Sequence, residues 1–399
     1  MKVLAINCGS STLKFSLLEG GVDGANYQRL ASGVVDDIGG QGAVRFSVDG
    51  GRELQRKAVV SDHGEAARLA LGWLSDIDLL RQGLDGVGHR IVHGGSYFSE
   101  PVLIDDRVVS IIESIGHLAL LHNGPALEAV RAARQVIPRS VPQVAVFDTA
   151  FFASIPEFAS RYAIPFELVD KYHIRRYGFH GLAHRYMIER YSAITATPMD
   201  KTRLITMQLG SGCSATAVSG GRPVDTSMGF TPLEGLMMST RSGDIDPSLV
   251  GFLARREGVD VSEVEDWLNT RSGLLGVSGR SGDMRELLKA EEDKRAMLAM
   301  EMFCYRVRKY LGSYLAVLGG ANGIIFGGGI GENSPEVRAS ICSGMEWCGL
   351  TLDEERNRAA VGVEARISSD QARMEAYVIP VDEGIIIARE TVRYLSDKT

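Results

Sequence analysis

Two segments of this chain share one local layout, and the repeat restricts the fold more than any other feature. KVLAINCGSSTLKFSLLEGG (residues 2–21) and RLITMQLGSGCSATAVSGG (203–221) each read as strand, Gly/Ser-rich turn, strand. They share layout rather than close identity. Internal self-similarity of this kind predicts two similar halves with a cleft between them. An amphipathic helix over 124–138, followed by a short apolar strand within 141–152, predicts an α/β fold.

The C-terminal half carries further expected elements. Apolar residues at spacings of three and four predict a long helix near 286–318. A strand, GIIF, should follow and lead into the loop GGGIGEN (327–333). The final segment, AYVIPVDEGIIIARETVRYL, reads as strand, turn and closing helix.

Length, charge and cysteine usage exclude several classes of protein. The 399 residues suggest two domains. A net charge of −7 carries no electrostatic footprint for nucleic acid, so an anionic substrate would need local cations. The five cysteines are scattered and contain no CxxC pair, which predicts a reducing compartment; they are Cys8, Cys213, Cys304, Cys342 and Cys348.

No targeting or membrane segment is expected. The start, MKVLAINCGS, reads as a core strand rather than a signal peptide. The most apolar stretch, LAVLGGANGIIFGGGI (315–330), is interrupted by glycines and Asn322. A membrane-spanning helix needs about 20 consecutive apolar residues. We therefore expect a cytoplasmic protein without a membrane partner.

Three glycine-rich turns are candidates for phosphate binding: NCGSST (7–12), QLGSGCS (208–214) and GGGIGEN. Glycine lets backbone amides approach an anion, and consecutive amides form a concave nest. None is a GxxxxGK[ST] loop or a GxGxxG within a βαβ unit. One such turn alone is more often structural, but three in one chain favour phosphate binding.

Several charged residues near these turns could act on a phosphorylated substrate. Lys14 follows Thr12 on the same strand face and could reach a phosphate, or could be a solvated edge lysine. Arg90 and Arg241 could clamp a carboxylate or phosphoryl group, although an arbitrary arginine more often forms a structural salt bridge. Asp148 ends an apolar strand, where ligands gather in α/β sheets, or it caps the next segment.

Two histidines and a glutamate complete the candidates. His122 and His180 are each flanked by apolar or aromatic residues, which is typical of core histidines. The functional alternative is a donor that stabilises charge on a transferred group. Glu383 opens the final helix, where the helix dipole favours an acid in any case, but it could hold Mg²⁺ together with the amide oxygen of Asn7.

Collinear motifs along essentially the whole chain identify a resemblance. They are INCGSSTLKFSL, GHRIVHGG, LLHNGP, VFDTAF, RRYGFHGLAH, DTSMGFTPLEGLMMSTRSGDIDP, SGLLGVSG and GGGIGEN. The chain resembles the acetate kinases, which belong to the acetate and sugar kinase, heat-shock chaperone and actin superfamily. This resemblance implies a duplicated ribonuclease H-like (actin-like ATPase) fold with a cleft between two lobes. The lobes would comprise residues 1–150 with 385–399, and residues 151–384.

The resemblance implies reversible phosphoryl transfer between ATP and acetate, dependent on Mg²⁺ with Mn²⁺ as an alternative, by a homodimer. Asn7 and Glu383 correspond to the metal-site residues, and Lys14 corresponds to a nucleotide phosphate contact. The catalytic residues would be Arg90, His122, Asp148, His180 and Arg241. Acetate is already a carboxylate near pH 7, so Asp148 is assigned an orienting and electrostatic role rather than proton removal.

The resemblance also implies two binding surfaces. The acetate pocket would be formed by Arg90 and the apolar residues Val92, Leu121, Phe179 and Pro232. The nucleotide would contact Ser10, Ser11, Thr12, Gln208, Leu209, Gly210, Ser211, Gly212, Asp283, Met284, Arg285, Gly329, Ile330, Gly331, Glu332 and Asn333.

The second phosphate loop departs from the family pattern. It commonly reads HLGNG, whereas this chain has Gln208 in place of the histidine and Ser211 in place of the asparagine. Gln208 keeps a neutral donor but carries no charge, and Ser211 is shorter. The preferred phosphoryl donor therefore stays open.

Two alternatives to an acetate kinase remain. Propionate differs from acetate by one methylene, which is worth only about 1–3 kcal/mol in an apolar pocket. Val92 nevertheless favours a small pocket. A nucleotide-switched binding protein of the same superfamily would not need Arg90, Arg241 or that pocket. A serine hydrolase is excluded because the sequence contains no GxSxG motif, the turn that carries the nucleophilic serine in α/β-hydrolases.

Overall fold

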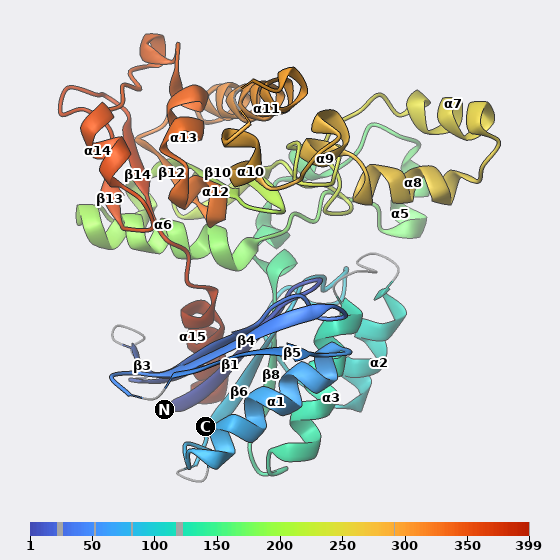
Figure 1. Ribbon diagram of the computed structural model, residues 1–399, viewed down its shortest axis with the longest axis vertical. Helices are drawn as coiled ribbons and strands as arrows, with labels where there is room; N and C mark the ends of the chain where they lie inside the picture. Colours follow the sequence, from blue (N-terminus) through green and yellow to red (C-terminus); the bar gives the residue numbers. More distant parts are fainter. Residues whose placement is uncertain (22–26, 52, 81–82, 117–122, 291, 399) are drawn as a thin grey trace. The chain divides into compact units, whose positions relative to one another are not determined.

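The computed structural model describes residues 1–21, 27–51, 53–80, 83–116, 123–290 and 292–398. Leu121 and His122 therefore lie outside the described residues. The chain divides into two compact units: unit 1 is Met1–Ala153 with Asp382–Thr399, and unit 2 is Ser154–Val381. Each is built on its own β-sheet with helices on its faces (Figure 1).

The described part of unit 1 contains an eight-stranded sheet in the order β5-β4-β3-β2-β1-β6-β8-β7. Its strands are β1 (Lys2–Cys8), β2 (Leu13–Gly20), β3 (Tyr27–Val35), β4 (Gln41–Val48), β5 (Glu53–Val59), β6 (Gly86–Ile91), β7 (Val102–Leu103) and β8 (Gln143–Phe147). Its α-helices are α1 (His63–Asp76), α2 (Asp106–Ser114), α3 (Asn123–Val136) and α15 (Glu383–Ser396). The 3-10 helix η2 (Asp148–Ser154) leads into unit 2.

Strand alternation decides which side chains of unit 1 face which helix layer. On β1, Leu4 and Ile6 belong to the core that also contains residues of α1 and α3, whereas Val3 packs with residues of α15. Asn7 lies on the same face of β1 as Val3, because successive side chains point to opposite faces of a sheet. The α15 face of the sheet therefore receives the side chain of Asn7.

The same alternation applies to β6, where close packing of α15 depends on glycine. A Cβ on Gly88 would lie 2.3 Å from Thr391 Oγ1 and 2.6 Å from Ile387 Cγ2, so only glycine lets the helix approach this strand. Arg90 is two residues further along and shares the face of Gly88. It emerges beside the N-terminal end of α15.

The described part of unit 2 contains a six-stranded sheet in the order β11-β10-β9-β12-β14-β13. Its strands are β9 (Arg203–Leu209), β10 (Cys213–Ser219), β11 (Arg222–Thr226), β12 (Gly323–Gly327), β13 (Ala365–Arg366) and β14 (Glu375–Val378). In both units a hairpin is paired in parallel with a later strand, β1/β2 with β6 and β9/β10 with β12. The predicted duplication of layout is thus present in the two sheets.

The helices of unit 2 differ from expectation in two places. They are α4 (Glu157–Ser160), α5 (Phe166–Tyr172), α6 (Gly181–Thr195), η3 (Met199–Lys201), α7 (Ser248–Glu257), α8 (Val261–Thr270), α9 (Gly273–Ser278), α10 (Met284–Leu288), α11 (Lys294–Leu318), α12 (Gly328–Asn333), α13 (Pro335–Cys342), η4 (Glu346–Cys348) and α14 (Glu354–Ala359). The expected helix over 286–318 is two helices, because Asp293 caps a new one by accepting from the amides of Arg295 and Ala296. The expected loop GGGIGEN is mostly the short helix α12.

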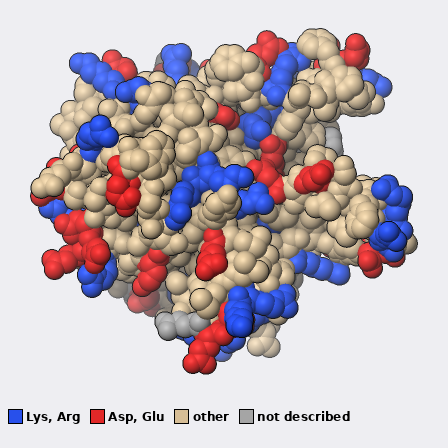
Figure 2. Space-filling model, turned by 90° about the horizontal axis from the view of Figure 1, so that it is seen from above, with Lys and Arg blue, Asp and Glu red and all other residues tan. Residues whose placement is uncertain are grey.

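The surface agrees with the charge balance of the sequence. On the face that Figure 2 shows, Lys and Arg side chains are interspersed with Asp and Glu side chains. Among the described residues, the helices are too short or too polar to cross a membrane.

Candidate active site

Polar side chains gather in unit 1 at the carboxyl ends of three neighbouring strands. Asn7 is near the end of β1, Arg90 near the end of β6, and Asp148 directly follows β8. These strands pair in parallel, so their carboxyl ends meet at one edge of the sheet. Glu383, the first residue of α15, joins them: its Oε2 lies 2.5 Å from Asn7 Nδ2. Ligands of open α/β sheets bind at such edges.

Arg90 is held firmly in this cluster. Its Nε lies 3.1 Å from both carboxylate oxygens of Asp148, its Nη2 donates to Asp148 Oδ2 at 2.6 Å, and its Nη1 donates to Asn7 Oδ1 at 2.8 Å. Burial alone would lower the pKa of Arg90, but the carboxylates of Asp148 and Glu383 outweigh burial and raise it. Of the five guanidinium N–H groups, these contacts use three. Because Nη1 also pairs with Glu383 Oε2 at 3.6 Å, the second N–H of Nη2 is the one left for an oxyanion among the described contacts.

The oxygen ligands here suit a divalent cation that is shared with a substrate. Mg²⁺ is usually held by one or two protein carboxylates together with substrate phosphates and water. Asn7 and Glu383 are in contact and together contain an amide oxygen, which accepts from Arg90 Nη1, and a carboxylate, which accepts from Asn7 Nδ2. Among the described residues, no group of three or more His, Cys, Asp or Glu side chains is arranged to hold a metal ion by itself. The pair fits a cation whose remaining ligands come from elsewhere.

Several of the other predicted residues of unit 1 belong to the first hairpin. Lys14 lies directly opposite Asn7 across the β1/β2 hairpin and is exposed. The Gly9 amide donates to the Thr12 carbonyl at 2.8 Å and closes the turn that carries the exposed Ser10 and Ser11. Val92 is buried just after β6. This turn is compatible with a phosphate contact.

Cysteine chemistry is not available beside this cluster. Cys8 is buried next to Asn7, and burial raises the pKa of its thiol to about 12. A thiol of this kind is not a nucleophile near neutral pH.

Four segments of unit 2 meet around one cavity of about 800 Å³. It is lined by Gly210, Ser211, Ser239, Gly282, Asp283, Met284, Arg285, Gly329, Ile330, Asn333 and Ser334. Its size lies within the range of small-molecule sites, about 300–1,000 Å³. Eight of the predicted nucleotide residues line it, from the three predicted segments that lie in unit 2.

Three lining residues were missed by sequence reasoning: Ser239, Gly282 and Ser334. The Ser239 amide donates to the Ser211 carbonyl at 3.1 Å, which fixes it against the second phosphate loop. No local pattern distinguishes this serine from its neighbours. Its only signal was its place in the long motif that carries Arg241.

Other predicted nucleotide residues support the loops rather than line the cavity. The Glu332 carboxylate accepts from the Gly328 amide at 2.8 Å and from the Val381 amide at 3.1 Å. The Gly331 carbonyl accepts from Arg338 at 2.8 Å. Leu209 is fully buried. These contacts fix the start of α12 beside the sheet.

We expect Gly328→Ala to destabilise unit 2 by about 1–3 kcal/mol. Gly328 has φ +76°, and a Cβ there would lie 2.6 Å from the Leu209 carbonyl oxygen, so the substitution is both strained and crowded. Chemical denaturation measures the loss. Gly329→Ala is the matched control, since a Cβ at Gly329 meets no atom within 4 Å. Equal stability of the two variants would contradict this account of the turn.

His180 and Arg241 lie together beside the second phosphate loop. A Cβ built on Gly212 would lie 3.4 Å from His180 Nε2 and 3.4 Å from Arg241 Nη1. The His180 Nδ1 edge faces Ser214 Oγ at 2.9 Å. Arg241 Nη1 donates to the Pro232 carbonyl at 3.4 Å, and burial lowers the pKa of its guanidinium. A donor and a cation are thus directed to one side of the loop.

The loop that carries Pro232 and Arg241 is braced by a network that sequence reasoning did not find. Glu234 accepts from the Tyr162 hydroxyl and from Arg176 Nη2, the latter at 2.6 Å. Arg176 also donates to the carbonyls of Thr226 and Ser227 at 3.2 Å. Phe179, predicted beside the acetate methyl, is buried in the same unit.

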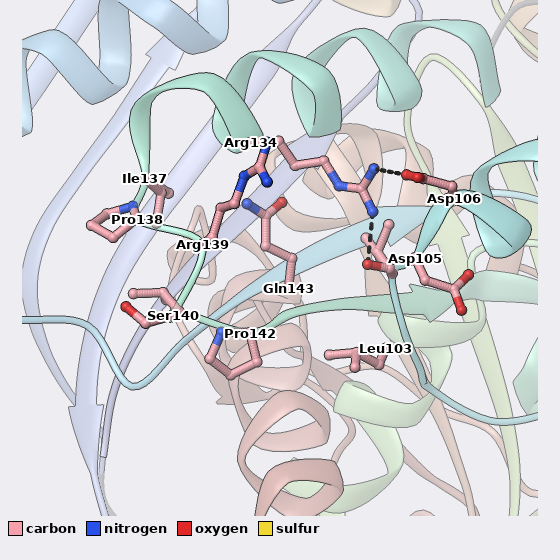
Figure 3. A pocket seen from close by; sticks show the side chains of 12 residues that line it. Leu103, Asp105, Asp106, Arg134, Ile137, Pro138, Arg139, Ser140, Pro142 and Gln143 are labelled. Atoms are coloured by element: carbon pink, nitrogen blue, oxygen red, sulfur yellow. Dashed lines mark hydrogen bonds and ion pairs between the residues drawn. The ribbon is translucent and has the colours of Figure 1, made fainter.

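A second cavity, of about 580 Å³, lies in unit 1 and contains none of the predicted site residues (Figure 3). Arg134, one of two arginines in its lining, donates to Asp106 at 2.8 Å and to the Ile104 carbonyl at 2.8 Å. Arg134 therefore connects α3 to the segment before α2. The functional candidates lie elsewhere.

Comparison with known proteins covers almost the whole chain. The acetokinase family model matches residues 2–389. The chain is 46% identical to an acetate kinase of Solibacter usitatus (strain Ellin6076) over 405 residues, with 98% of each sequence covered. It is 43% identical to an acetate kinase of Chloroherpeton thalassium (strain ATCC 35110 / GB-78) over 416 residues, with 100% of each covered.

Solved structures agree with this match. The crystal structure of Porphyromonas gingivalis acetate kinase is similar with a TM-score of 0.88 at 40% identity, covering 99% of each chain. A propionate kinase from Francisella tularensis subsp. tularensis SCHU S4 is similar with a TM-score of 0.88 at 38% identity, covering 98% of each. The predicted family and the predicted α/β, two-sheet actin-like ATPase fold are confirmed. The chain belongs to the acetokinase family.

Proposed function

We propose that this chain catalyses reversible, Mg²⁺-dependent phosphoryl transfer from ATP to acetate by direct in-line displacement. An acetate oxygen forms a bond to the γ-phosphorus, and the bond from that phosphorus to the β,γ-bridging oxygen breaks. The products are acetyl phosphate and ADP. Acetate needs no deprotonation, because carboxyl groups of its kind have pKa values of about 4–5.

The gathering of Asn7, Arg90, Asp148 and Glu383 supports this proposal most directly. Phosphoryl transfer depends on positioning and on neutralising charge rather than on covalent chemistry. Asp148 is fully buried and holds Arg90 by paired contacts, so the guanidinium is oriented before substrate arrives. The second N–H of its Nη2 can donate to the acetate carboxylate or to an oxygen of the phosphoryl group in transit.

Asp148 acts as an orienting group in this proposal. Its carboxylate is occupied by Arg90, and acetate offers no proton to remove. His180 and Arg241 supply the second set of donors, which stabilise charge on the transferred group. The residues His122 and Leu121 are proposed on the resemblance alone.

Asn7 and Glu383 would hold the Mg²⁺ ion together with nucleotide phosphates. The ion would neutralise charge on the phosphate oxygens. In unit 2, the cavity around Ser211, Met284 and Ile330 would receive the nucleotide. The amides of the glycine turns would contact its phosphates.

Propionate is a second candidate acceptor. A propionate kinase and an acetate kinase have the same TM-score to this chain, 0.88. The two acids differ by one methylene, worth about 1–3 kcal/mol. The pocket residues proposed for the methyl group are Val92, Phe179 and Pro232, and Val92 and Phe179 are buried. Val92 is small, so we favour acetate.

The proposal is tested by incubating the purified chain with ATP and Mg²⁺ and trapping acyl phosphate as hydroxamate. Acetate, propionate and butyrate are compared, and a parallel reaction contains excess chelator. We expect acetate to react best, propionate less well, and the chelated reaction to stop. Propionate ahead of acetate would favour the second candidate.

Failure of the assay would also be informative. Activity only with another phosphoryl donor would point to Gln208 and Ser211 in the altered phosphate loop. ATP hydrolysis without acyl phosphate would instead favour a nucleotide-switched binding protein. The homodimer, the cytoplasmic location and the assignment of units 1 and 2 as the two lobes of the enzyme are parts of the same proposal.

A further inference from the structure

We propose that Ser214 and His184 are positioning residues that hold the imidazole of His180 with its proton on Nε2, the nitrogen beside Arg241. This inference rests on the proposed phosphoryl transfer for its kinetic consequence. It also makes a prediction about the protein alone, because the protonated nitrogen of His180 can be observed without substrate.

A continuous chain of hydrogen bonds runs from the sheet of unit 2 to His180. Thr206 Oγ1 on β9 lies 2.7 Å from His184 Nδ1 on α6. His184 Nε2 lies 2.7 Å from Ser214 Oγ on β10, and that oxygen lies 2.9 Å from His180 Nδ1. Thr206, His184 and Ser214 are fully buried. Residues of β9, α6 and β10 thus form one chain, and its last member, Ser214, contacts the Nδ1 edge of the His180 ring.

The direction of these bonds follows from the neutral state of His184. Burial, followed by the neighbouring His180, lowers the pKa of His184 well below its ordinary value. A neutral imidazole has one N–H and one acceptor nitrogen, and a hydroxyl has one proton to donate. If the Ser214 hydroxyl donates within this chain, the chain donates either from Thr206 toward His180 or from His180 toward Thr206.

The first direction suits the site. If Thr206 donates to His184, then His184 donates to Ser214, and Ser214 donates to His180 Nδ1. The His180 proton then lies on Nε2, close to Gly212 and Arg241 Nη1. A neutral ring can donate toward a phosphoryl oxygen only in this tautomer.

The backbone of His180 explains why its ring needs this support. His180 precedes α6 with φ 59° and ψ 29°, a left-handed conformation that is uncommon for residues other than glycine. Such conformations persist where surrounding contacts hold them, and they cluster at functional sites. The bond to Ser214 fixes the ring of a residue whose backbone is already restricted.

The kinetic test compares Ser214→Ala with Thr216→Val, which removes another buried hydroxyl from the same strand. Thr216 lies two residues along β10, is fully buried, and hydrogen-bonds Thr226 rather than a histidine. We expect Ser214→Ala to lower kcat about tenfold to a hundredfold with KM values nearly unchanged. Thr216→Val should leave kcat within about twofold of wild type. In a His180→Ala background, Ser214→Ala should have almost no further effect.

A spectroscopic test covers the case in which the variant folds poorly or the proposed reaction is absent. The ¹⁵N shifts of the His180 ring in the wild-type protein, assigned by comparison with His180→Ala, report which nitrogen is protonated. We expect the proton on Nε2. A proton on Nδ1 would overturn the proposal, as would an equal loss of kcat in both backgrounds. A wild-type protein that makes no acyl phosphate would instead overturn the proposed function, while the ring shifts would still decide this inference.

Discussion

Arg90→Ala is expected to abolish acyl phosphate formation, by about a thousandfold or more, and to destabilise the protein at the same time. The kinetic loss follows because arginines that neutralise a transferring phosphoryl group contribute about 10³–10⁵ in rate. The loss of stability follows because Asp148 is fully buried and would lose the cation that compensates its carboxylate. Removing one member of a buried pair costs about 3–5 kcal/mol. Hydroxamate trapping and urea denaturation measure the two effects.

A double variant separates these effects. Arg90→Ala with Asp148→Ala removes both buried charges, and we expect it to recover much of the stability but none of the activity. Arg134→Ala is the control, since Arg134 pairs with an exposed carboxylate, Asp106 (Figure 3). It should cost no more than about 1 kcal/mol and leave activity unchanged. Recovery of activity in the double variant would contradict the role assigned to Arg90.

The two hairpins could be predicted from sequence because their signals are local, whereas β3, β4 and β5 of the unit 1 sheet were not predicted. Both hairpins, β1/β2 and β9/β10, were visible as apolar alternation around a Gly/Ser turn. Helix α12 was expected to be a loop because glycine is a poor helix former. Its support comes from Glu332, whose carboxylate accepts from the Gly328 amide at the start of the helix. Such a contact follows from the fold rather than from propensity.

Candidate residues could be singled out where the signal was a charged or polar side chain, and their roles stay predictions. Asn7, Arg90, Asp148 and Glu383 stood out as polar residues at element ends, and they lie together in unit 1. Ser214 did not stand out, although it belongs to one of the quoted turns. Its importance arises because strand β10 is in register with β9, and because α6 crosses that face of the sheet with His184 inward. Residues whose role depends on three elements meeting have no local pattern.

Arg241→Ala should reduce kcat about as much as Arg90→Ala, about a thousandfold, but with little loss of stability. Among the described residues, Arg241 has no carboxylate partner: its hydrogen bonds are to the Pro232 carbonyl and to the Met238 sulfur, at 3.4 Å and 3.7 Å. Its removal therefore leaves no buried charge unpaired. We expect the free energy of unfolding to fall by no more than about 1 kcal/mol.

Arg241→Lys tests whether charge alone is sufficient. Lysine is a point charge and lacks the planar fork of a guanidinium, so we expect it to restore less than about a tenth of the activity. Arg190→Ala, which removes an exposed pair with Glu364, is the control and should change neither kcat nor stability appreciably. A large loss of stability in Arg241→Ala would show that the loop needs this side chain for its structure. Full activity in Arg241→Lys would show that a positive charge alone is sufficient. Either result would contradict our expectation that Arg90 and Arg241 contribute about equally to kcat. We expect the two arginines to differ only in their contacts within the protein, since Arg90 pairs with a buried carboxylate and Arg241, in the part of the chain that the structure describes, does not.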